Sequence, residues 1–366
     1  MSRMKNKILL VGSIPGRDAT EAMRTCAEGI GNYLDCIPDG ETGMRRIWIN
    51  YLAATTYDGN PALETINRPA PVDIGHPDEW REVGEDWAPR GYKDHWQFRL
   101  KPGVESVYFE QLGYGAAAKR SYTDFCALRE AGSVPKEARF MVAIPLIESG
   151  IRAFLTDPSD FAPMWVAYEE ALQREIKMIT DNIPAEDLVV QWDICMEVLA
   201  VEVGDHHPQI FPWQPAGDAF ERYLKAVTVA SSCVPETVLL GLHLCYGDLG
   251  HQHVSEPPDL SVVVKMANAA TAKVERQIDY YHMPVPRDRN DDAYFEPLKD
   301  FYSGNGKLYL GLVHVTGGVD TSLGLLATAK RHTAAFGIAT ECGFGRRPIT
   351  SMPALLEIHR SIANAL

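Results

Sequence analysis

The chain has 366 residues, of which 46% are hydrophobic, and a formal net charge of −14 at pH 7. Its apolar content is sufficient for a large core, and its negative charge argues against nucleic acids and anionic membranes as partners. No run of about 18 apolar residues predicts a membrane-spanning helix. The apolar run near the first Met is too short for a secretory signal, so we expect a cytoplasmic protein.

Apolar runs with β-forming residues recur along the chain, and most precede a helical pattern. The eight predicted strands cover 7–13, 32–40, 139–145, 187–194, 237–246, 277–284, 307–315 and 336–343. The clearest predicted helices cover 161–180, 219–229, 260–274, 321–336 and 352–366. This alternation predicts an α/β fold, a single decorated (β/α)₈ TIM barrel over 1–366. An open doubly wound sheet is the alternative, but no Gly-x-Gly-x-x-Gly turn follows the first strand.

A long segment, 44–138, separates the second and third predicted strands. It is rich in aromatic residues: Trp48, Trp80, Trp87, Tyr92, Trp96, Phe98, Tyr108 and Tyr114. One interpretation is an insertion that forms a lid over the barrel mouth, with an aromatic wall for substrate. The other is a packing subdomain or a contact surface within a homo-oligomer.

Three residues at strand ends have the chemistry of metal ligands. The seven cysteines have no framework spacing, which is typical of a reduced protein. His243 and Cys245 end the fifth strand on one face, because positions i and i+2 of a strand share a face. Cys342 ends the eighth strand, and carboxyl strand ends carry the active site of a barrel. One imidazole and two thiolates suit Zn²⁺, although a core cysteine pair with a satisfied histidine is the alternative.

Other polar residues also fall at the carboxyl ends of predicted strands. They are Ser13, Glu41, Asp193, His282, His314, Thr316 and Arg346. A carboxylate within an apolar strand, such as Asp193, is costly to bury unless it is paired. Each residue alone is explained by a cap or a loop ion pair, but their shared placement predicts one site.

These residues together resemble the catalytic C-terminal barrel of cobalamin-independent methionine synthase, in the superfamily that includes uroporphyrinogen decarboxylase. Five short matches in chain order carry the resemblance: Val-Gly-Ser13-Ile-Pro, Asp-Gly-Glu41, Gln-Trp-Asp193, His243-Leu-Cys245-Tyr and Glu-Cys342-Gly. The resemblance implies that the serine holds an amino-acid carboxylate and that Glu41 and Asp193 hold the amine. It also implies that the last two matches supply a nitrogen and two sulfurs to zinc.

The departures from that family bear on the ligands and the donor. The family's fourth zinc ligand is a glutamate on strand six, where this chain offers His282 or Asp279; Glu256, or no protein ligand, are further options. Thr316 takes the register of the family's strand-seven histidine, with His314 two residues earlier. The family's folate-stacking tryptophan is absent from 144–149, so methyl-folate is not the expected donor.

The resulting hypothesis is a zinc-dependent transferase in which a small-molecule thiol, bound as zinc thiolate, attacks a methyl or larger alkyl donor. Ser13, Glu41, Asp193, Thr316 and Arg346 are the expected substrate-binding residues. His314, Asp193 and His282 are the expected proton-transfer residues, and His282 is also the candidate fourth metal ligand. The alternatives are an epoxide-opening thiol transferase resembling epoxyalkane:coenzyme M transferase, a metal-free uroporphyrinogen decarboxylase-like lyase, and a non-catalytic zinc or binding module.

Overall fold

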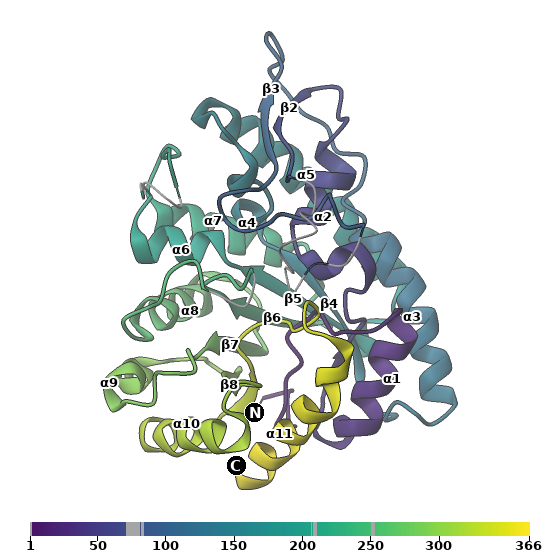
Figure 1. Cartoon of the computed structure of the whole chain (residues 1–366), viewed down its shortest axis with the longest axis vertical. Coiled ribbons are helices and arrows are strands. Elements are labelled where there is room, and N and C mark those ends of the chain that lie inside the picture. The colour runs from purple at the N-terminus through teal and green to yellow at the C-terminus, as the bar shows by residue number, and fades with distance from the viewer. Residues whose placement is uncertain (1, 71–80, 82–83, 206, 208–210, 250–252) are drawn as a thin grey trace.

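The computed structural model describes every residue except 1, 71–80, 82–83, 206, 208–210 and 250–252. Its centre is a curved sheet of seven parallel strands in the order β1-β4-β5-β6-β7-β8-β9 (Figure 1). The strands are β1 (Cys36–Pro38), β4 (Arg139–Pro145), β5 (Leu188–Ile194), β6 (Leu239–Leu244), β7 (Tyr280–Pro284), β8 (Lys307–Val313) and β9 (Gly337–Thr340). The predicted α/β class with a parallel sheet is confirmed, and the sheet forms a half-barrel.

The predicted first strand, 7–13, is not a regular strand. Ile8 forms isolated parallel bridges with Leu34, before β1, and with Ile338 on β9. Two backbone hydrogen bonds accompany them, from Ile8 N to Tyr33 O at 3.0 Å and from Leu9 N to Ile338 O at 2.9 Å. The N-terminal segment therefore lies between the two edge strands of the sheet.

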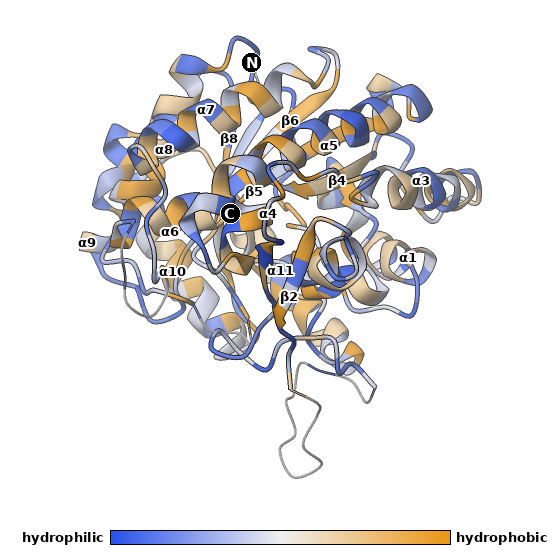
Figure 2. Ribbon diagram, turned by 90° about the horizontal axis from the view of Figure 1, so that it is seen from above, coloured by the Kyte–Doolittle hydropathy of each residue, from blue (hydrophilic) through white to orange (hydrophobic). Residues whose placement is uncertain are grey.

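Helices cover the outside of the sheet (Figures 1 and 2). The α-helices of the described residues are α1 (Ala19–Ile30), α2 (Asn50–Leu52), α3 (Tyr114–Glu130), α4 (Ile147–Ile151), α5 (Phe161–Asn182), α6 (Met196–Val203), α7 (Ala219–Ser232), α8 (Ser261–Lys273), α9 (Asp292–Phe295), α10 (Gly318–His332) and α11 (Met352–Ala365), of which α2 lies in the segment beyond the strand ends. The five predicted helices match α5, α7, α8, α10 and α11. Among the residues described, no helix has the length and apolar character needed to cross a bilayer.

The segment 44–138 has two parts. Its first part contains α2 and an antiparallel pair, β2 (Leu63–Asn67) and β3 (Gln97–Leu100), which project from one end of the molecule (Figure 1). Its second part is α3, which packs against α1 and α5 and so belongs to the outer layer of helices. We name residues 44–113, the first part, the insertion. Trp80, one of its predicted aromatic residues, lies outside the described residues.

Every second side chain of each strand points into the interior of the curved sheet, and these side chains form layers. Along β5, Val189 joins a separate apolar cluster, Gln191 lies in the middle, and Asp193 lies at the carboxyl end. The Tyr280 hydroxyl donates to Gln191 Oε1 at 2.8 Å, and Gln191 Nε2 donates to Asp193 Oδ1 at 2.8 Å. The layers thus change from apolar to polar toward the carboxyl ends.

Strand register places three of the predicted polar residues in one row. Asp193 pairs with His243 across β5 and β6, and His243 pairs with His282 across β6 and β7. Gly241 lies one layer below, where a Cβ would lie 1.9 Å from the Tyr280 ring. A side chain at Gly241 would therefore displace the ring that supports Gln191.

Candidate metal centre and its cavity

A cavity of about 300 Å³ opens at the carboxyl ends of the strands. We call its strand-end side the floor: Gly12, Ser13, Glu41, Asp193, Cys195, His243, Cys245, Cys342, Gly343 and Arg346. The opposite side, which we call the roof, comes from the insertion: Ile47, Trp48, Ile49, Asn50, Pro89, Gly91, Tyr92, Lys93 and His95. The remaining lining is mostly apolar and includes Phe154, Met196, Leu199, Leu249 and Val254. The cavity therefore combines a polar floor with a largely apolar upper part.

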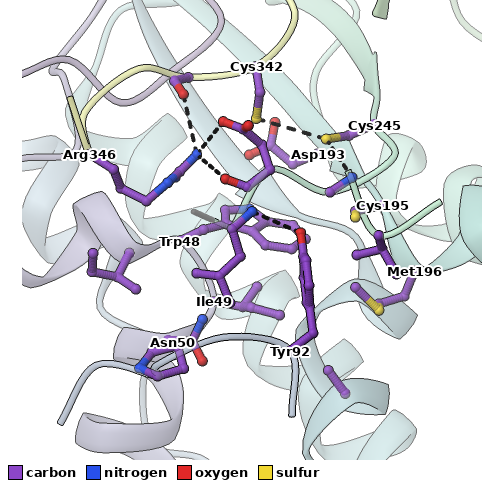
Figure 3. A pocket seen from close by; sticks show the side chains of 18 of the residues that line it. Trp48, Ile49, Asn50, Tyr92, Asp193, Cys195, Met196, Cys245, Cys342 and Arg346 are labelled. Atoms are coloured by element: carbon purple, nitrogen blue, oxygen red, sulfur yellow. Dashed lines mark hydrogen bonds and ion pairs between the residues drawn. The ribbon is translucent and has the colours of Figure 1, made fainter. Parts of the chain in front are cut away.

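Three potential metal ligands converge on the floor. One ligand atom from each of His243, Cys245 and Cys342 lies within 4.8 Å of the others. The two Sγ atoms are 3.8 Å apart and point toward each other (Figure 3). Two sulfurs at about 2.3 Å from a tetrahedral zinc would also be separated by about 3.8 Å. The spacing therefore fits zinc, and it is too long for a disulfide, whose sulfurs lie about 2.05 Å apart.

The His243 ring has one engaged and one unpartnered nitrogen. Its Nδ1 lies 2.7 Å from Nδ1 of His282, whereas its Nε2 is buried and has no hydrogen-bond partner. Burial and the His282 ring lower the pKa of His243 well below its usual value. A neutral imidazole with a buried, unpartnered nitrogen beside two thiols has the donor set that zinc requires.

The three candidates for a fourth protein ligand lie elsewhere or have other partners. His282 uses Nδ1 toward His243, and its Nε2 lies 2.9 Å from Thr340 O. Asp279 precedes β7 at the amino end of the sheet, where both its oxygens accept from Arg3. The Glu256 side chain is 69% exposed. In the described part of the chain, the metal-ligand group therefore contains three residues.

Cys195 is a third thiol on the floor that the sequence analysis did not single out. It follows Asp193 by two residues at the end of β5, and a hydrogen bond with it raises the pKa of Cys245 well above its usual value. The Gly247 backbone N–H also donates to Cys245 Sγ at 3.3 Å. The two-residue spacing from Asp193 was the available signal, because it predicts the same face of the strand. All seven cysteines are free.

Two buried carboxyl groups, Asp193 and Glu41, share the floor. Burial raises the pKa of Asp193 to about 7. Hydrogen bonds from Gln191 and Trp48 lower this pKa, but their effect is smaller than that of burial. Burial and the nearby Asp193 charge raise the pKa of Glu41 well above its usual value. Like charges in one low-dielectric site cannot both ionise easily. A cationic group of a ligand would relieve this repulsion.

The backbone around Glu41 is held in an unusual conformation. Glu41 has φ +49°, and its N–H donates to Asp39 Oδ1 at 2.9 Å. Asp39 is in turn paired with Arg45 at 2.5 Å and accepts from the Ser121 hydroxyl at 2.9 Å. A Cβ on Gly12 would lie 2.7 Å from Glu41 Oε1, so a glycine there leaves space for the carboxyl group. These contacts fix Glu41 over the floor.

Ser13 and Arg346 also line the cavity, and Arg346 belongs to the loop that follows Cys342. Ser13 Oγ accepts from Gly345 N at 3.2 Å. Arg346 is buried and pairs with Asp248, with 2.6 Å between Nη2 and Oδ2. The Arg346 Nε atom is buried without a hydrogen-bond partner. The arginine is therefore ion-paired, and its Nε–H has no protein partner that would compete with a ligand or a water molecule.

Three predicted residues, His282, His314 and Thr316, are not among the residues that line the cavity. His314 is buried, with Nε2 3.0 Å from Val285 O and Nδ1 3.3 Å from Glu341. Thr316 is exposed in the turn after β8. His253 also contacts Glu341, at 3.2 Å. Although burial opposes it, the two histidines lower the pKa of Glu341 to about 2.

The roof carries backbone strain of its own. Among the described residues, Glu41 and Trp48 are the two non-glycine residues with positive φ, and both line the cavity. Trp48 has φ +42°, and a side-chain hydrogen bond between Trp48 and Asp193 joins the roof to the floor. Such conformations cost of order 1–3 kcal/mol and persist at sites where the surroundings impose them.

The predicted aromatic wall is only partly realised. Trp48 and Tyr92 line the cavity, and the Tyr92 hydroxyl accepts from Leu249 N at 2.8 Å (Figure 3). Trp96 and Phe98 stack on each other in the core, with ring centroids 5.9 Å apart. Tyr108 is 62% exposed. Most of the described aromatic residues of this segment therefore serve packing, and a few serve the cavity.

Comparison with solved structures shows the same fold in two proteins. A B12-independent methionine synthase from Shewanella sp. W3-18-1, solved in complex with selenomethionine, matches with a TM-score of 0.53 and 13% identity over 99% of this chain and 97% of that chain. A methyltransferase from Methanosarcina mazei matches with a TM-score of 0.52 and 11% identity over 96% and 94%. No protein-family model and no curated protein sequence matches the chain.

Proposed function

We propose that this protein is a zinc-dependent transferase that activates a small-molecule thiol for attack on a methyl or larger alkyl donor. The observation that carries the proposal is the group formed by His243, Cys245 and Cys342 on the cavity floor, with ligand atoms within 4.8 Å. The shared fold with a methionine synthase and a methyltransferase supports the same reaction class.

We also propose that the segment around Ile8 completes an eight-stranded (β/α)₈ barrel. Its bridges to Leu34 and Ile338, on opposite edges of the sheet, support this closure. In such barrels the active site lies at the carboxyl ends of the strands, where the cavity lies here. The insertion then contributes the cover of the barrel mouth.

The residues that would hold zinc are His243 through Nε2, Cys245 and Cys342. When bound, zinc favours the thiolate form of a coordinated thiol near neutral pH. Because three protein ligands are available in the described chain, one position of a tetrahedral site is left for the substrate thiol. A structural zinc site normally uses four protein ligands, so this count favours catalysis.

The floor carboxyl groups fit a thiol that also bears an amine. Asp193 and Glu41 are buried close enough for the charge of one to raise the pKa of the other. An ammonium group between them would add a positive charge beside both carboxyl groups and so favour their ionised forms. Ser13 and the free Nε of Arg346 provide polar contacts at the edge of the same floor. The proposed acceptor is therefore a small aminothiol.

The apolar upper part of the cavity fits the alkyl donor. Trp48, Ile49 and Met196 surround this space with few charged groups. In the transfer, the thiol loses its proton, a sulfur–carbon bond forms, and the bond from that carbon to the leaving group breaks. Asp193, with a pKa of about 7, can supply a proton to the leaving group. His314 and His282 do not line the cavity, so we assign this role to Asp193.

The proposal is tested with purified protein reconstituted with zinc chloride. We expect about one bound zinc, and release of about one proton per zinc when cysteamine is added at pH 7. Metal-free protein should release none. Recovery of less than about half an equivalent of zinc, or cysteamine binding without proton release, would contradict the proposal. A uroporphyrinogen decarboxylase-like lyase requires neither result.

A further inference from the structure

The contact between His243 and His282 joins two buried rings through the same type of atom. Their Nδ1 atoms are 2.7 Å apart, and the ring centroids are 4.8 Å apart with planes tilted by 45°. One of the two nitrogens must donate a proton and the other must accept it. Which nitrogen donates determines whether His243 Nε2 carries a lone pair or a proton.

The second contact of His282 decides the direction. Its Nε2 lies 2.9 Å from the carbonyl oxygen of Thr340, and a carbonyl oxygen only accepts hydrogen bonds. His282 must therefore carry its proton on Nε2. Its ring is fully buried, and its hydrogen-bond partners are a histidine and a backbone carbonyl. A second proton on this ring would be a buried charge without a paired carboxylate, which is costly.

From these contacts we infer that His282 is a positioning residue that fixes the tautomer of His243. Neutral His282 presents a lone pair on Nδ1, so His243 Nδ1 carries the proton and donates. The His243 Nε2 atom then carries no proton, and its lone pair is free to bind a metal. It is buried beside Cys245 and Cys342 without another partner. Metal-binding histidines are commonly fixed in this way by carbonyls or carboxylates. Here His282 lies between the Thr340 carbonyl and His243, and it transmits the effect of that carbonyl to the His243 ring.

The two hydrogen bonds of His282 also exclude it as a metal ligand. Both its nitrogens are used, so it supplies no ligand of its own to the metal group. It connects β6 to β9 instead, because Thr340 is the last residue of β9 and lies two positions before Cys342. The same chain of hydrogen bonds thus links the elements that carry His243 and Cys342.

The inference rests on the proposed zinc site, but its main test uses metal-free protein. Nitrogen-15 NMR of the histidine rings should show His243 protonated on Nδ1 and unprotonated on Nε2, and His282 the reverse. A His243 ring protonated on Nε2 in metal-free wild-type protein would overturn the inference. Failure of the protein to bind zinc would instead contradict the proposed function and leave the tautomer result standing.

Three substitutions separate positioning from packing. In His282→Asn the amide oxygen can replace Nδ1 as the acceptor, so zinc affinity should stay within a few-fold of wild type. In His282→Gln the amide reaches the Nε2 position instead, and in His282→Leu both contacts are lost. Both should weaken zinc binding by about 10- to 100-fold, the range for such partners. His359→Gln is the matched control, because this fully buried histidine bonds to Leu355 O in α11. Equal zinc affinity in His282→Leu and wild type would overturn the inference.

Discussion

The floor and the roof of the cavity differ in how their residues are placed. The floor residues His243, Cys245 and Asp193 come from β5 and β6, whose register pairs Asp193 with His243 directly. The roof residues Trp48 and Tyr92 come from an insertion that mixes short helices with irregular backbone. A floor placed by a sheet can hold ligand atoms at fixed separations, whereas a roof of loops is free to suit a different donor. Under the proposed function, the floor would activate the thiol and the roof would select the donor.

The largest effect is expected from removing a sulfur of the floor. Cys342→Ser should lower zinc affinity by more than about 100-fold, because loss of a direct ligand exceeds the effect of losing a partner of a ligand. Cys233→Ser is the matched control, since this half-buried cysteine contacts Val229 O on the outer helix α7. Competition with a chromogenic chelator measures the affinity. Zinc retained equally by both variants would remove Cys342 from the ligand set.

A smaller effect is expected at the carboxyl pair. The pKa of Asp193 is raised to about 7 in the fold, so the folded protein binds this proton more tightly than the unfolded chain. Stability therefore falls as pH rises from about 4 to 7, and the cost persists above 7. Asp193→Asn should raise the free energy of unfolding at pH 8 by at least about 1 kcal/mol, with no gain near pH 4.

Denaturant titrations at both pH values measure this difference. Asp181→Asn is the control, because Asp181 is 55% exposed and pairs with Lys177 on the surface of α5. The same Asp193→Asn variant should bind cysteamine about 10-fold more weakly while 2-mercaptoethanol binding is unchanged, since the amine loses its partner. A uniform loss with both thiols would assign Asp193 to general packing of the floor.

The roof is tested by its selectivity for apolar groups. In zinc-loaded protein, affinity for alkanethiols from ethanethiol to hexanethiol should rise by about 0.8 kcal/mol per buried methylene. Trp48→Ala should flatten this slope without changing zinc content, because it removes apolar surface from the upper cavity. Tyr302→Ala, at a 67% exposed aromatic residue, is the control. An unchanged gain in affinity per methylene in Trp48→Ala would show that Trp48 does not contribute to donor binding.

The smallest effect is expected where the roof meets the loop after β6. Tyr92→Phe removes the acceptor for the Leu249 N–H, which lies 2.8 Å from the hydroxyl. The net cost of one such hydrogen bond is about 1 kcal/mol. Hydrogen exchange of the Leu249 amide should therefore accelerate about 5-fold, with zinc affinity unchanged. Unaltered exchange would show that this contact does not hold the roof.

The sequence predicted the floor better than the roof, for a physical reason. A strand fixes side-chain direction through its two-residue period, so His243 and Cys245 could be assigned to one face, and their approach to Cys342 followed from the parallel sheet. The same rule would have found Cys195. The unpaired nitrogen of His243 and its contact with His282 depend on cross-strand register, which the periodicity of one strand does not contain.

Other features depended on contacts between distant segments. The predicted first strand at 7–13 is reduced to bridges at Ile8, and α3, within the segment 44–138, packs with the outer helices. Thr316 and His314 follow β8 as predicted but lie outside the cavity lining. The positive φ of Trp48 and its approach to Asp193 arise from tertiary constraints on a loop. Local sequence patterns carry little information about such constraints.

Zinc K-edge X-ray absorption of the reconstituted protein tests the central claim most directly. The account predicts one zinc with one imidazole nitrogen and two sulfurs at about 2.3 Å, and a third sulfur at that distance after cysteamine is added. A closed shell of four protein ligands that is unchanged by the thiol, or the absence of sulfur from the shell, would contradict it.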